Sequence, residues 1–247
     1  MSIPSATGSR LLNMVSAAAD FASRALPFVL SLTAGSTDII GFLGLNGLFT
    51  AHITGNLVVL AAHIVAGDPT IFSYVLSVPV FMVVLFLTRV LAGGLEQIEV
   101  STLRPLLLLQ LFFLAAFLSV CLVAGPWRDA NAIPAVSAGM FGVAAMAVQN
   151  ALVQISLTNT PTTAVMTTNV THFMLDLGDA LVGRDHAQTA RARARAMHTL
   201  PVIVGFAIGC VLGAAFEAAA GLWSLTLPTG LAALAFAMGF GERRRGS

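Results

Sequence analysis

Long apolar stretches alternate with short polar ones along most of this chain. Six of these stretches hold about 20 mainly apolar residues each, which is the length that an α-helix needs to cross the hydrocarbon core of a membrane. Such a segment is stable in lipid because a helix satisfies its own backbone hydrogen bonds there. The six predicted spans are approximately 25–45, 71–93, 105–124, 133–156, 199–220 and 223–241.

Two further segments are short or polar, and each follows a predicted span almost without a loop. Residues 53–66 form an apolar stretch of only about 14 residues, and residues 161–182 contain His172, Asp176 and Asp179. We predict that each is a re-entrant or broken helix, and an arrangement in which all eight segments cross the membrane is the alternative. The predicted fold class is therefore all-α: a polytopic transmembrane helix bundle of about six full spans plus two short re-entrant or broken helices.

The arginines set the predicted orientation, since cytoplasmic loops retain basic residues during insertion. With two re-entrant segments, eleven of the 12 basic residues, all of them arginine, lie on the cytoplasmic side, and only Arg128 lies outside. With eight crossings the split becomes ten to two. Both arrangements place both termini in the cytoplasm, and the margin favours the re-entrant one. We interpret the arginine-rich stretch 183–197 as an anchor on anionic lipid headgroups.

Composition supports one membrane domain with two short flanking segments. The chain is 57% hydrophobic and only 9% charged, whereas soluble domains average roughly 25% charged residues. Membrane lipids are therefore expected partners, and a basic surface for nucleic acid is not expected. Residues 1–24 are predicted to form an amphipathic helix along the cytoplasmic headgroups. Residues 25–241 form the transmembrane domain, and 242–247 form a basic cytoplasmic tail.

A polar motif recurs in the two halves of this domain. Shifting the sequence by 113 residues places residues 50–56 on residues 163–169, with four of the seven positions identical. Each half, about 25–124 and 133–241, then contains one span, one short Thr/Asn segment and two more spans. An odd number of crossings would invert the second half. An inverted internal repeat is typical of transporters and channels whose sites lie near the midplane, where broken helices of the two halves meet.

The repeated hydroxyl and amide side chains are candidates for lining a pathway for a small polar or anionic solute. The alternative is packing alone, because Ser, Thr and Asn in membrane helices often bond to the preceding turn or to a neighbouring helix. Ionisable side chains inside the spans join the set, since a charge in hydrocarbon costs at least ~2.5 kcal/mol. His172 and Asp176, one turn apart, suit either a proton relay or a structural contact. The candidate pathway residues are Asp38, Thr50, His52, Thr54, Asn56, Asn150, Thr163, Thr167, Asn169, His172 and Asp176.

Other functional signatures are missing from the sequence. It contains no nucleotide-binding glycine loop, no nucleophile elbow and no Cys or His cluster at metal spacing, so we expect no enzyme activity, cofactor or metal. Cys121 and Cys210 are expected to be small core residues. Gly205, Gly209 and Gly213 form a small-residue face that we expect to pack within the chain, with a homo-oligomer as the alternative.

Three motifs resemble those of a known family. The sequence AGSTD at residues 34–38 is followed by GLFTAHITGN at 47–56, and VMTTN comes later, at 165–169. In these motifs, and over about residues 25–240, the chain resembles the YoaK-like bacterial membrane proteins of the DUF1275 family. The resemblance implies a polytopic bacterial inner-membrane protein of about six helices whose molecular function is largely unassigned. It implies no substrate, so the transport hypothesis depends on the repeat and the polar motif. A non-transporting membrane protein that binds lipid or partner proteins is the second hypothesis.

Overall fold

A computed structural model gives the structure of the chain. It describes the backbone of residues 6–68, 72–125, 127, 129, 131–158, 160–183 and 185–240, and the side chains of this set from residue 25 onward. The side chains of the predicted N-terminal amphipathic segment, Arg128 and the basic tail lie outside the described residues. Every regular element in the described part is a helix, which confirms the all-α fold class.

The first short segment forms a helix over the predicted residues, whereas the second starts later than predicted. The chain leaves its helical path at residues 157–165, around Pro161, and becomes helical again at Met166. Proline lacks a backbone N–H and restricts the residue before it, which favours such an interruption. The elements in chain order are α1 (Ala6–Gly44), α2 (Ile53–Ala66), α3 (Phe72–Gln97), α4 (Leu103–Ala124), α5 (Ile133–Ser156), α6 (Met166–Val182), α7 (His186–Ala220), the 3₁₀ helix η1 (Gly221–Leu225) and α8 (Thr226–Met238).

A left-handed turn ends α1. Asn46 and Gly47 have φ angles of 54° and 90°, and Asn and Gly adopt this conformation with the least strain. The Gly47 N–H donates to the carbonyl of Phe42 at 2.8 Å, which satisfies one of the free carbonyls at the helix end. The Tyr74 hydroxyl of α3 donates to the carbonyl of Asn46. The turn is therefore fixed both by its own residues and by the next span.

Helix α7 is much longer than the apolar span inside it. Its N-cap is Asp185, whose side chain accepts a hydrogen bond from the Ala187 N–H at 3.0 Å. The helix has 35 residues, which corresponds to about 52 Å at 1.5 Å per residue. Alanine and arginine are strong helix formers. The arginine-rich stretch therefore extends the helix before the predicted span instead of forming a separate loop.

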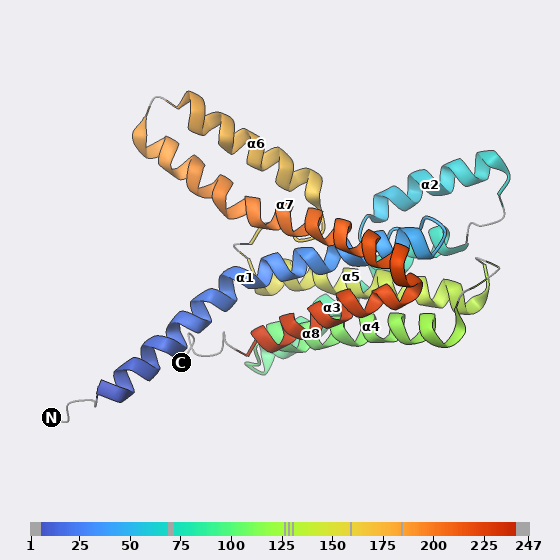
Figure 1. Cartoon of the computed structure of the whole chain (residues 1–247), viewed down its shortest axis with the longest axis horizontal. Coiled ribbons are helices and arrows are strands. Elements are labelled where there is room, and N and C mark those ends of the chain that lie inside the picture. Colours follow the sequence, from blue (N-terminus) through green and yellow to red (C-terminus); the bar gives the residue numbers. More distant parts are fainter. Residues whose placement is uncertain are drawn as a thin grey trace.

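Six helices, α1, α3, α4, α5, α7 and α8, run along the bundle, and the chain turns back at η1 between the last two (Figure 1). At one end, Thr102 lies 2.8 Å from Ser156 between their hydroxyl oxygens, and Arg104 donates to the carbonyl of Gly239 at 3.0 Å. We call this the Arg104 end. At the opposite end Ser224 of η1 donates to the carboxylate of Glu217. We call this the Glu217 end.

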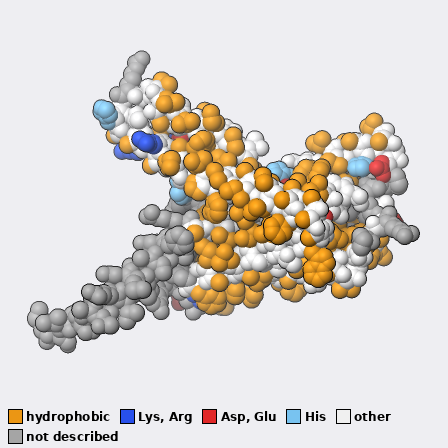
Figure 2. Space-filling model, viewed as in Figure 1, with side chains coloured by type: hydrophobic (Ala, Val, Ile, Leu, Met, Phe, Trp, Pro, Cys, Tyr) orange, Lys and Arg blue, Asp and Glu red, His pale blue; other side chains and the backbone are white. Residues whose placement is uncertain are grey.

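Five stretches are long and apolar enough to cross a membrane. Four of them are single helices, and the fifth, His186–Met238, contains α7, η1 and α8, within which the chain reverses. Figure 2 shows apolar side chains over the visible face of the bundle, and arginines at the outer end of α6 and α7. This distribution is that of a polytopic helical membrane protein, because lipid solvates apolar side chains and excludes charge.

The buried core falls into three clusters along the bundle. One cluster lies at the Arg104 end and one at the Glu217 end, and on α1, α4 and α5 the residues of the third fall between those of the other two. The middle cluster contains both Ala51 and Ala164, which occupy the same position of the repeated motif. Both chain interruptions therefore reach the middle of the bundle. The middle cluster consists of Ala34, Ala51, Leu114, Ala145, Met146, Ala164 and Ala232.

The small-residue face packs within the chain, against α1. A Cβ atom at Gly209 would overlap the carbonyl oxygen of Leu32, and one at Gly35 would overlap the carbonyl oxygen of Phe206. The backbones of α1 and α7 therefore touch, as small residues permit in membrane helices. Ser31 adds a hydrogen bond to the α7 backbone, at the carbonyl of Val202, with a length of 2.6 Å. A homo-oligomer stays a prediction.

The two short helices lean away from the bundle in different directions (Figure 1). Helix α2 runs outward toward the Glu217 end and packs against α3, whereas α6 runs outward toward the Arg104 end and packs against α7. Each begins at an interruption near the middle of the bundle. The fold therefore places one interruption and one outward helix on each half of the sequence.

Candidate functional site

The first interruption, residues 45–52, is fastened to α1 by a buried carboxylate. Asp38 Oδ1 accepts the backbone N–H groups of Thr50 and Ala51, both at 2.7 Å, and the Thr50 hydroxyl at 3.3 Å. Its Oδ2 accepts from Nδ1 of His52 at 2.6 Å. Asp38 is only 4% exposed, and a buried carboxylate requires such donors to replace water. Asp38 therefore holds the start of α2 against the first span.

Asn56 closes the same interruption from its other side. Its side-chain oxygen accepts the Phe49 N–H at 2.9 Å, and its side-chain nitrogen donates to the Phe49 carbonyl at 2.7 Å. Asn56 is fully buried. An amide side chain has the same donor and acceptor groups as a peptide, so it can replace the pairing that the broken helix lacks. Both functional groups of Asn56 are therefore used by the chain itself.

The second interruption repeats this arrangement 113 residues later. Asn169 Nδ2 donates to the Thr162 carbonyl at 2.6 Å, and its oxygen accepts from the Thr162 hydroxyl at 3.3 Å. The two residues are seven positions apart, as Asn56 and Phe49 are. In place of a carboxylate, α5 supplies Gln149, whose Nε2 donates to the Thr163 hydroxyl at 2.8 Å. The equivalent interruptions are thus fastened by equivalent asparagines, but only the first contains a charge.

A chain of buried amides connects the second interruption to the rest of the bundle. Gln149 Nε2 also donates to the Leu30 carbonyl of α1 at 2.9 Å, and Gln149 Oε1 accepts from Gln110 of α4 at 2.7 Å. Among the described side chains, Gln110 Oε1 is buried without a hydrogen-bond partner. Gln110 and Gln149 thus join α4, α5 and α1 around Thr163.

A cavity of about 450 Å³ opens beside the first interruption. Helix α1 contributes Asp38, and the interruption contributes His52, whose side chain is 38% exposed. The third wall comes from α7. The other lining side chains are mainly apolar, so a solute here would meet one ion pair in an apolar surrounding. The lining residues are Asp38, Ile39, Phe42, Phe49, His52, Gly55, Phe206 and Cys210.

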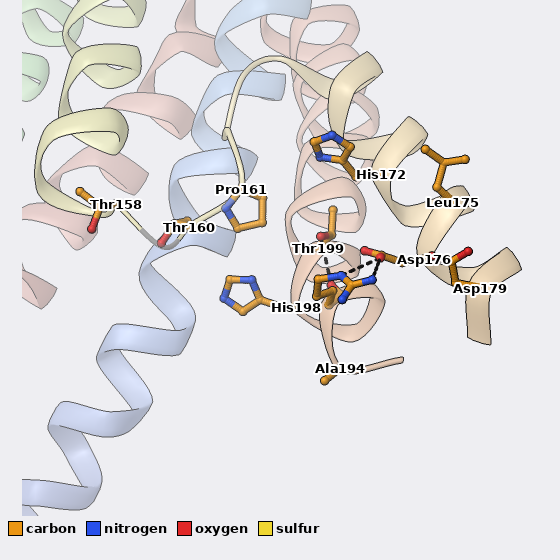
Figure 3. Close-up of a pocket in the computed structure, with 11 residues that line it drawn as sticks. Thr158, Thr160, Pro161, His172, Leu175, Asp176, Asp179, Ala194, His198 and Thr199 are labelled. Carbon is orange, nitrogen blue, oxygen red and sulfur yellow. Dashed lines mark hydrogen bonds and ion pairs between the residues drawn. The ribbon is translucent and has the colours of Figure 1, made fainter. Parts of the chain in front are cut away.

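A second and more polar cleft of about 920 Å³ lies beside the second interruption, between α6, α7 and the segment that precedes α6 (Figure 3). Asp176 of α6 accepts from Arg195 of α7, at 2.7 Å from Nε and 2.6 Å from Nη2. His172 and His198 lie on the same cleft. Asp176 therefore pairs with the arginine of the next helix, and no hydrogen bond to His172 is found among the described residues.

The remaining predicted site residues do not all join these cavities. Thr54 and Thr167 lie on exposed surface of α2 and α6. Asn150 donates to the Met146 carbonyl of its own helix at 2.9 Å. Thr50 and Thr163 are buried at the two interruptions. The structure thus brings Asp38, Thr50, His52 and Asn56 together at the first interruption. It brings Thr163 and Asn169 together at the second, and places His172 and Asp176 on the cleft beside it.

Sequence reasoning missed several residues of both sites. The aromatic walls Phe42, Phe49 and Phe206 carry no local signal, since phenylalanine is common in any membrane span. Gln110 could have been found, because an amide inside a predicted span is unusual. Arg195 was assigned only to a headgroup anchor. Among the described residues, no three His, Cys, Asp or Glu side chains are grouped as a metal site would require.

The fold and the two interruptions define a polytopic helical membrane protein with two broken helices. A family model described as "Protein of unknown function (DUF1275)" matches residues 26–238, and the chain belongs to this family. The chain is also similar to the UPF0700 transmembrane protein YoaK of Bacillus subtilis (strain 168), with 33% identity over 91 residues. That match covers 36% of this chain and 40% of the length of YoaK. No solved structure matches the chain.

Proposed function

We propose that this membrane protein is a transporter or channel for a small solute, with the two interruptions as the fixed points of its pathway. The observation that carries the proposal is the buried Asp38–His52 pair at the mouth of a cavity, 2.6 Å apart. A charge inside a membrane bundle is costly and usually marks a site for a substrate, ion or proton. The proposed location is the bacterial inner membrane, with the Arg104 end in the cytoplasm.

The two cavities support a pathway along α7. Phe206 and Cys210 of α7 line the cavity at the first interruption, and Arg195 to Thr199 line the cleft at the second. Seven residues separate Thr199 from Phe206, which is about 10 Å along a helix. Pro201 lies in this interval, and proline weakens a helix locally. In the proposed mechanism the two halves form an inverted repeat, and a shift of α7 opens the solute to one cavity or the other.

The hydrogen bonds of the interruptions limit the pathway to part of the predicted set. Asn56 and Asn169 spend their polar groups on the backbone. In this proposal they keep the broken helices in shape, whereas Asp38, His52, His172 and Asp176 meet the solute. Since the described chain residues offer no nucleotide-binding glycine loop, an ion gradient or the gradient of the solute itself is the proposed driving force.

A second candidate function is a membrane protein that binds lipid or partner proteins without transport. The observation that favours it is that the buried side chains of Thr50, Asn56, Thr163 and Asn169 all find partners inside the protein. Polar side chains that are matched in this way can serve packing alone. The two candidates differ in whether solute flux depends on Asp38 and His52.

Flux in liposomes separates the two candidates. Purified protein is reconstituted, and light scattering follows the entry of urea, glycerol, acetate salts and choline salts. We expect a solute-dependent flux that His52→Ala and Asp38→Asn abolish. His63→Ala is the matched control, because His63 pairs with Asp68 at 2.9 Å near the far end of α2, away from the cavity. Flux that is unchanged in folded Asp38→Asn and His52→Ala protein would overturn the assigned pathway.

A further inference from the structure

Aromatic rings surround the cavity at the first interruption. The ring centroids of Phe42 and Phe49 are 4.7 Å apart, those of Phe49 and His52 are 5.8 Å apart, and those of His52 and Phe206 are 5.7 Å apart. The rings come from α1, the interruption and α7, so they form a wall on three sides. An aromatic ring presents a negative face, which attracts a cation within about 6 Å.

The ionisable groups of the cavity cannot give it a positive charge while Asp38 is ionised. Asp38 and His52 are the only acidic or basic side chains among its described lining residues, and Cys210 is engaged as a thiol with the Gly35 carbonyl. Their sum is −1 when His52 is neutral and zero when His52 is protonated. An anion would meet a carboxylate without an opposing fixed cation, whereas a cation would meet a carboxylate and three phenylalanine rings.

We propose that this cavity binds a monovalent organic cation with an apolar body, such as a quaternary ammonium or a protonated amine. The inference rests on the proposed function and names its substrate class. A cavity of about 450 Å³ lies within the usual size of small-molecule sites, roughly 300–1,000 Å³. The rings hold the apolar body and the charged head faces the Asp38–His52 pair. The sequence alone had pointed to a polar or anionic solute.

Equilibrium binding tests the charge preference directly. The full chain is placed in nanodiscs of zwitterionic lipid, and radiolabelled benzyltrimethylammonium is compared with benzenesulfonate, a soluble anion of similar size. Empty nanodiscs correct for partition into lipid. We expect the cation to bind at least about tenfold more tightly than the anion, since one charge contact with a desolvated site is worth roughly this factor. Equal affinity, or tighter binding of benzenesulfonate, would overturn the proposal.

Ring substitution tests the location of the site. Phe206→Leu keeps an apolar side chain but removes the ring, and we expect it to weaken benzyltrimethylammonium binding about five- to tenfold. Phe112→Leu is the matched control, because Phe112 is 60% exposed on α4 and does not line the cavity. Asp38→Asn should weaken binding further. If that variant fails to fold, Phe206→Leu still decides, and affinity within twofold of the parent overturns the proposal.

The outcome is distinct from that of the flux experiment. Binding of benzyltrimethylammonium without its flux would support the cation site and contradict transport. Flux of another solute without binding of the cation would support transport and contradict the cation site.

Discussion

Asn56 holds the Phe49 peptide group at both ends, accepting its N–H at 2.9 Å and donating to its carbonyl at 2.7 Å. Asn169 repeats the donor half of this contact on the Thr162 carbonyl at 2.6 Å. The backbone at an interruption cannot bond to water or lipid in the middle of a bundle, so its groups must be matched by protein. The two asparagines therefore explain how the chain tolerates a broken helix at that depth.

Asn56→Ala is expected to destabilise the protein by about 2 kcal/mol, because it leaves the buried N–H and carbonyl of Phe49 without partners. The free energy of unfolding would be measured by reversible denaturation in mixed micelles. Asn150→Ala is the matched control, since the Asn150 amide donates only to its own helix at the Met146 carbonyl. If both variants lose the same free energy, the special role of Asn56 is wrong.

Gly209→Ala is expected to cost about 1–3 kcal/mol, because the new methyl group would overlap the Leu32 carbonyl and push α7 away from α1. Gly93→Ala in α3 is the control, since no atom lies within 4 Å of the added Cβ. Replacing a helical glycine by alanine there should be neutral or stabilising by up to ~1 kcal/mol. Thermal unfolding in detergent compares the two variants. A Gly209→Ala protein as stable as Gly93→Ala would contradict the close packing of α1 and α7.

The helices and the first interruption could be predicted because their causes are local. Span length, Asn46 with Gly47, and the short apolar segment after them all act within a few residues of the chain. Asp38 and His52, both predicted as site residues, are only 14 positions apart. The chain doubles back directly after α1, which brings them together. The repeat pointed in the same way to the second interruption.

The rest of the site could not be predicted because it depends on which helices pack together. Phe206 reaches the first cavity only because α7 packs against α1, and Arg195 reaches Asp176 only because α6 folds back on α7. Neither pairing leaves a trace in local periodicity. The use of Asn56 and Asn169 was also hidden, since the same amide can face a solute or the backbone of its own chain.

Asp176→Asn is expected to loosen α6 from α7, because it weakens the contact between the Asp176 carboxylate and Arg195. The Arg195 side chain is 57% exposed, so solvent screening limits the effect to about 1 kcal/mol. Hydrogen exchange of the α6 amides should become faster by roughly fivefold. Asp179→Asn is the control, since Asp179 is an exposed neighbour on the same helix. Equal exchange rates in the two variants would show that the pair does not hold α6.

Cysteine labelling from one side of the membrane should separate the re-entrant arrangement from eight full crossings. In a background without Cys121 and Cys210, single cysteines would replace Ala66, Glu99 and Gln188, which are all exposed. If α2 and α6 turn back in the bundle, Glu99 and Gln188 react from the cytoplasmic side and Ala66 from the outside. If both helices cross, Ala66 and Gln188 share the cytoplasmic side and Glu99 reacts from outside. The three positions therefore give different patterns, and we expect the first, because both interruptions contribute to the middle cluster of the core. The second pattern would mean that α2 and α6 reorient in lipid relative to the bundle.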